Sequence, residues 1–250
     1  MKTILTLLLA ALLQLSATAR AAEINVFAAA SLSDVFTELA PQFTAATGHT
    51  LRFNFGASGA LARQIKEGAP ADAIFSADEL RVDQLEKAGL LLPGTRRTLL
   101  ANSLVVVVGI EGDAPVSTLD DLKKAGVRRI AIGEPATVPV GTYTKEHLQT
   151  TKLWSQVIDK CVPLDTVRAV LAAIESGNAD AGFVYKTDAL ISKKVRIAIE
   201  IPRESGPSIT YPGAVLKEAR QPEAATAFLD WLAGPAAQAA FAKYGFAPVR

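Results

Sequence analysis

Strand-like and helix-like segments alternate along almost the whole chain, and this alternation constrains the fold more than any other feature. Residues 23–28 and 51–55 have the apolar pattern of strands, and residues 32–43 carry apolar side chains at helical spacing. We expect Pro41 to kink or end that helix. Further strands are predicted at 72–76, 103–109, 129–132, 180–185 and 195–200, and further helices at 60–66, 78–87, 140–149, 166–175, 222–232 and 235–243.

Repeated strand-then-helix units form mostly parallel sheets with helices on both faces. One series of units precedes the strand at 103–109 and a second follows it. The 250 residues suffice for two small cores. The sequence therefore predicts the α/β class, with two doubly wound α/β lobes and a ligand cleft between them, where strands end and helices begin.

The N-terminus has the layout of a secretory signal peptide. Lys2 precedes an apolar run at 4–15, which is too short to span a bilayer, and Ala19-Arg20-Ala21 offers a cleavage site. We expect a signal peptide at residues 1–22, with cleavage near Ala21 or Ala22 on export. The whole chain has 26 Lys+Arg and 25 Asp+Glu, so loss of Lys2 and Arg20 leaves 24 against 25 and a net charge of −1.

Composition excludes several classes of function. A balanced charge argues against nucleic-acid binding, and the single Cys161 can form neither an intrachain disulfide nor a zinc site. With only His49 and His147, and no G-x-S-x-G around Ser58, a hydrolase triad is disfavoured, so we expect no enzyme. Phenolate binding of ferric iron stays open as an alternative, through Tyr143, Tyr185, Tyr211 and Tyr244.

Small and polar residues mark the predicted junctions between strands and helices. Ser31 and Ser58 stand at two helix starts, and residues 139–141 and 165–167 open two more. The first N–H groups of each helix lack intrahelical partners and carry partial positive charge, so together they form a cradle for an anion. A serine at a helix start is, taken alone, more often a cap than a ligand group.

Six segments of the chain resemble the periplasmic molybdate-binding proteins of ABC importers, which are type II periplasmic binding proteins. They are spread over nearly all of the predicted mature chain: FAAASLSDVF (27–36), LARQIKEGAPADAIFSAD (61–78), NSLVVVV (102–108), VPVGTYTKEHL (138–148), DTVRAVLAAIESGNADAGFVY (165–185) and GPAAQAAFAKYGF (234–246). The resemblance implies an oxyanion site made of the Ser31 and Ser58 hydroxyls, the Val140 and Val167 amides and the Tyr185 hydroxyl.

The resemblance also implies a periplasmic monomer that captures molybdate or tungstate and delivers it to a membrane permease without a cofactor. Lobe I is expected at 23–101 and 214–250 and lobe II at 102–213, with hinges near 102–103 and 211–213. A site made only of donors disfavours phosphate, whose O–H needs an acceptor. Sulfate, phosphate, ferric iron and a small organic anion stay open as other solutes, and an exported enzyme as another class.

Overall fold

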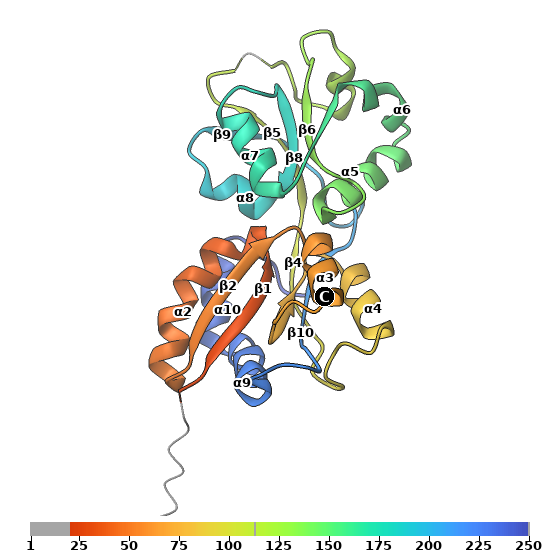
Figure 1. Cartoon of the computed structure of the whole chain (residues 1–250). Helices are drawn as coiled ribbons and strands as arrows, with labels where there is room; N and C mark the ends of the chain where they lie inside the picture. Colours follow the sequence, from red (N-terminus) through yellow and green to blue (C-terminus); the bar gives the residue numbers. More distant parts are fainter. Residues whose placement is uncertain (1–20, 113, 250) are drawn as a thin grey trace, which may run out of the picture.

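The computed structural model describes residues 21–112 and 114–249, which form two lobes, each built on a five-stranded sheet (Figure 1). Of the predicted signal peptide, residues 1–20 lie outside the described residues. The first sheet has the order β2-β1-β3-β10-β4, with β1 at Glu23–Ala29, β2 at Thr50–Gly56, β3 at Ala73–Phe75, β4 at Arg97–Asn102 and β10 at Ile209–Val215. The second has the order β7-β6-β8-β5-β9, with β5 at Leu104–Gly109, β6 at Ile130–Gly133, β7 at Cys161–Leu164, β8 at Ala181–Tyr185 and β9 at Val195–Glu200.

Helices flank both sheets, as the α/β prediction requires. The first lobe carries η2 at Ala30–Leu32, α2 at Ser33–Thr47, α3 at Ser58–Lys66, α4 at Glu79–Lys87, α9 at Pro222–Leu232 and α10 at Pro235–Lys243. The second lobe carries η3 at Leu119–Lys123, α5 at Pro139–Thr150, α6 at Trp154–Val157, η4 at Ile158–Lys160, α7 at Val167–Glu175 and α8 at Lys186–Ile191. The two-lobed fold is thus confirmed, and the predicted bounds of β9, α9 and α10 match the structure.

Both sheets are mixed, but each is mostly parallel as expected, because four of its five strands run in the same direction and one runs the other way. β1 pairs in parallel with β2 and β3, and β6 with β7 and β8. The strand that follows each crossing between lobes runs the other way: β10 is antiparallel to β3 and β4, and β5 is antiparallel to β8 and β9. The chain leaves and re-enters each lobe from the side of the other lobe, which reverses these strands.

The position of β10 differs from the sequence analysis, which read Tyr211, Pro212 and Gly213 as a hinge. They lie within the first sheet, where a register shift between Tyr211 and Pro212 accommodates a residue that has no N–H. At Gly213, a Cβ atom would approach the Phe75 ring to 2.6 Å, so glycine allows the strand to pack there. The chain crosses between lobes at 102–103 and again at 201–208, between β9 and β10.

Pro41 also behaves differently from the prediction, because α2 continues through it to Thr47. Pro41 and Thr37, four residues before it, both face solvent, so water can bond the Thr37 carbonyl that loses its helical partner. The opposite face of α2 is buried, with Phe36 in edge contact with Phe75 at 5.0 Å between ring centroids. Core packing on that face outweighs the missing hydrogen bond, and the helix ends instead at Gly48, which has φ of 78°.

Candidate functional site

A small cavity lies between the two lobes where strands end and helices begin. Its volume is about 210 Å³, including the part that is open to solvent. It is lined by Ala29, Ala30, Ser31, Gly56, Ala57, Ser58, Ala77, Val138, Pro139, Val140, Val167 and Tyr185. All five residues that the sequence analysis singled out therefore line one cavity, and none of the described residues that line it carries a charge.

Ser31 occupies the middle of the short helix η2, between β1 and α2, and is buried. Its side chain caps neither η2 nor α2. Instead Ser31 Oγ lies 3.0 Å from the hydroxyl oxygen of Tyr211 on β10. The capping role that is common for serine at such a junction is therefore absent here.

Ser58 is the first residue of α3, and Ala57 holds the N-cap position without a side-chain cap. Ser58 Oγ accepts a hydrogen bond of 3.0 Å from the backbone N–H of Ala77, which lies in the short segment between β3 and α4. The Ser58 hydroxyl proton is not needed for that bond. Both serine hydroxyls are thus hydrogen-bonded within the first lobe, Ser31 to Tyr211 and Ser58 to Ala77, and neither caps its helix.

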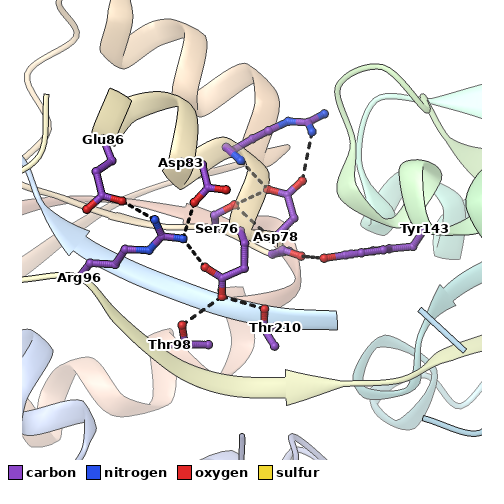
Figure 2. A network of polar contacts seen from close by, with 11 residues as sticks. Ser76, Asp78, Asp83, Glu86, Arg96, Thr98, Tyr143 and Thr210 are labelled. Atoms are coloured by element: carbon purple, nitrogen blue, oxygen red, sulfur yellow. Dashed lines mark hydrogen bonds and ion pairs between the residues drawn. The ribbon is translucent and has the colours of Figure 1, made fainter. Parts of the chain in front are cut away.

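The segment around Ala77 is held by polar networks that Figure 2 shows from close by. Ser76 Oγ donates to Asp78 Oδ1 at 3.0 Å, and the same oxygen accepts from the Arg81 N–H. Arg96, just before β4, forms ion pairs of 2.5 to 2.7 Å with three carboxylates of α4, those of Glu79, Asp83 and Glu86. These contacts fix the backbone that presents its N–H to Ser58.

Val140 and Val167 stand at the N-termini of α5 and α7 in the second lobe. Val140 follows Pro139, so its N–H is the first that α5 can offer. Val167 is the first residue of α7, where the Thr166 side chain caps the Ala169 N–H and leaves the Val167 N–H without a helical partner. Each backbone donor carries the partial positive charge of its helix end.

Tyr185 ends β8 and is buried, with its hydroxyl oxygen lacking any hydrogen-bond partner among the described residues. An unpartnered buried hydroxyl is costly, by about 1–3 kcal/mol, so it points to a missing acceptor. Burial first, then the neighbouring Tyr211, raises the pKa of Tyr185 well above its ordinary value. The phenol therefore stays protonated and serves as a donor.

The same reasoning weakens the iron alternative. Burial raises the pKa values of Tyr143 and Tyr211 as well, which opposes phenolate formation, and Tyr244 contacts Glu38 at 2.9 Å, away from the cavity. Over residues 21–112 and 114–249, no group of three His, Cys, Asp or Glu side chains is placed to hold a metal ion. What the cavity offers is a set of neutral donors.

The lobes are closed on one another around the cavity. The Gly59 N–H donates to the Thr137 carbonyl at 3.1 Å, and the Tyr143 hydroxyl donates to the Ala77 carbonyl at 3.3 Å, reaching the segment that carries Ser76 and Asp78 in Figure 2. Arg168 Nη2 contacts Asp34 at 2.5 Å across the same gap. Sequence reasoning missed Gly59 and Arg168, although both flank predicted site residues.

Tyr211 and Asn102 are further residues whose place the sequence did not reveal. Asn102 Nδ2 lies 3.2 Å from the Tyr211 hydroxyl, which in turn contacts Ser31. The sequence analysis considered Tyr211 only as a possible iron ligand and as part of a hinge. The one available signal was its aromatic ring beside a predicted lobe crossing.

Comparison with known proteins gives consistent matches. The family model for bacterial extracellular solute-binding proteins matches residues 24–247. The chain is 39% identical to the molybdate-binding protein ModA of Escherichia coli, over 90% of this chain and 88% of that one. It is 40% identical to YvgL of Bacillus subtilis, provisionally described as an ABC transporter substrate-binding lipoprotein, over 89% of this chain and 85% of that one. The periplasmic molybdate-binding protein of Azotobacter vinelandii superposes with a TM-score of 0.81 at 27% identity, covering 91% of this chain and 100% of that one.

Proposed function

The chain belongs to the family of bacterial extracellular solute-binding proteins, and we propose that its solute is molybdate, or the similar tungstate, which it delivers as a monomer to an ABC import permease. Members of this family bind solutes for transport and are not catalysts. Relatives named for molybdate binding support the choice of solute. The proposed ligand groups are those that line the cavity: Ser31, Ser58, Val140, Val167 and Tyr185.

The observation that carries this proposal is the buried Tyr185 hydroxyl without a partner in a small cavity free of charged side chains. A tetrahedral dianion offers four oxygens that all accept, and this cavity offers hydroxyl and N–H groups that all can donate. Charge-assisted hydrogen bonds contribute about 1.5–3 kcal/mol each, so five offer roughly 8–15 kcal/mol before the cost of closing the lobes. That range is compatible with micromolar to nanomolar binding.

A ligand panel tests the proposal. We expect molybdate and tungstate, each at about 100 times its dissociation constant, to stabilise the protein by about 2.7 kcal/mol, or roughly 5–10 °C in Tm. Sulfate and phosphate should give much smaller shifts in differential scanning fluorimetry. Tyr185→Phe keeps the ring and removes the unpartnered hydroxyl, so it should reduce the molybdate shift without lowering the Tm of the ligand-free protein. A Tm shift with sulfate or phosphate alone would mean that this anion, and not molybdate, is the solute. No Tm shift with any oxyanion would contradict the proposal.

We also propose export with cleavage of the signal peptide. Among the described residues, no helix has the length and apolar character needed to cross a bilayer. Ala22 belongs to the folded lobe, since its N–H lies 3.2 Å from His49 Nδ1 and its carbonyl accepts from the Thr50 N–H at 2.8 Å. Cleavage after Ala21 keeps both contacts, whereas cleavage after Ala22 removes them. The intact mass of the periplasmic protein should therefore correspond to a chain that begins at Ala22, and a chain beginning at Glu23 would contradict this assignment.

A further inference from the structure

We propose that Tyr211 and Asn102 are positioning residues that hold the Ser31 hydroxyl as a hydrogen-bond donor toward the bound anion. This inference rests on the proposed function, since it concerns the same cavity. Neither residue lines the cavity, and both are buried behind it. A serine hydroxyl can donate or accept, so its hydrogen-bond partners on the side away from the cavity decide whether it donates into the cavity or accepts from it.

The orientation of the Asn102 amide starts the argument. The backbone N–H of Ser103 lies 2.9 Å from one end of that amide, and because an N–H only donates, the atom facing it is the oxygen Oδ1. The nitrogen Nδ2 therefore faces the other way, at 2.9 Å from Thr187 Oγ1 and 3.2 Å from the Tyr211 hydroxyl. Tyr211 thus receives a hydrogen bond from Asn102.

The direction of the next bond follows. Because Tyr211 accepts from Asn102, its own proton is directed to Ser31 Oγ at 3.0 Å. Burial, and next the nearby Asp188, raise the pKa of the Tyr211 phenol, so the proton is retained. Ser31 then accepts from Tyr211. Its own proton has no other acceptor among the described residues and is left for an oxygen in the cavity.

Ser31 lies in η2, Asn102 ends β4 and Tyr211 lies in β10, all in the first lobe, so the contacts among these three residues do not wait for the lobes to close. Such preorganisation favours ions whose oxygens all accept. An anion that carries an O–H needs an acceptor in the cavity, and a serine free to rotate would provide one. The pair Tyr211 and Asn102 thereby sets selectivity for fully ionised oxyanions over protonated ones.

Tyr211→Phe is the first test, because it keeps the ring that packs against Tyr185 and Phe246 and removes only the hydroxyl. By calorimetry with competition, molybdate affinity should fall about 5- to 10-fold, and the ratio of molybdate to phosphate affinity should fall with it. Tyr143→Phe is the matched control: its hydroxyl bonds the Ala77 carbonyl and not Ser31, so it should leave that ratio unchanged.

A double-mutant cycle distinguishes positioning from a merely structural role. Ser31→Ala should weaken molybdate binding about 10- to 100-fold, and adding Tyr211→Phe to it should change affinity less than about twofold. Additive losses, or an unchanged ratio of molybdate to phosphate affinity in Tyr211→Phe, would overturn the inference while leaving the proposed function intact. If the wild-type protein binds no oxyanion, the proposed function itself fails, which is a separate result.

Discussion

Gly59→Ala should weaken molybdate binding about 10- to 100-fold while the ligand-free protein remains as stable as the wild type or becomes slightly more stable. A Cβ atom at residue 59 would lie 2.4 Å from the carbonyl oxygen of Thr137, which is backbone of the other lobe. Overpacking of this kind costs about 1–3 kcal/mol, and here the cost arises only when the lobes close. In the open protein the substitution only replaces glycine by alanine within α3, which favours the helix.

The measurement is calorimetric affinity together with small-angle scattering in the presence of molybdate. The variant should remain more extended than the wild type at equal saturation. Gly126→Ala is the matched control, because a Cβ there meets only the Pro115 side chain at an ordinary 3.4 Å. Since Gly59 does not line the cavity, wild-type affinity in Gly59→Ala would show that the observed closure is not the ligand-binding conformation.

The elements that sequence reasoning located correctly are those whose signal is local. The strand at residues 195–200 and the helices at 222–232 and 235–243 have clear periodicity and distinct boundaries, and each helix begins with proline at its first position. The junctions at Ser31, Ser58, 139–141 and 165–167 were expected to meet because strand-to-helix junctions of an α/β protein converge on one edge. The choice of Val140, Val167 and Tyr185 within that edge came from the family resemblance.

The elements that sequence reasoning missed depend on tertiary contacts. β10 contains Pro212 and Gly213, which indicate a turn locally, yet a bulge and the close approach of Phe75 make them part of a sheet. Likewise, each serine taken alone was expected to be a cap more often than a ligand group. Only the contacts of Ser31 with Tyr211 and of Ser58 with Ala77, at sequence separations of 180 and 19, decide against capping. No local pattern encodes these partners.

Arg168→Ala should destabilise the protein by about 3–5 kcal/mol at pH 8, the typical cost of leaving one member of a buried ion pair alone. Asp188 is completely buried in α8, and Arg168 Nε lies 2.9 Å from its Oδ1. The outer contact of Arg168, with Asp34 on the first lobe, involves a carboxylate that is 43% exposed. Asp34→Ala should therefore cost at most about 1 kcal/mol, since exposed pairs contribute little.

The dependence on pH identifies the mechanism. Burial, opposed by Arg168, raises the pKa of Asp188 from 3.8 to about 6, so the folded protein binds this proton more tightly than the unfolded chain does. The stability that this group contributes is therefore fully present below about pH 4 and is lost as the pH rises through about 6. Without Arg168 the pKa rises further, so urea titrations should show a larger deficit for Arg168→Ala at pH 8 than at pH 5. Arg168→Ala combined with Asp188→Asn, which removes the buried charge, should regain most of the stability and lose that pH dependence. An equal deficit at both pH values, with no rescue by Asp188→Asn, would mean that Arg168 stabilises the second lobe by packing and not by neutralising Asp188.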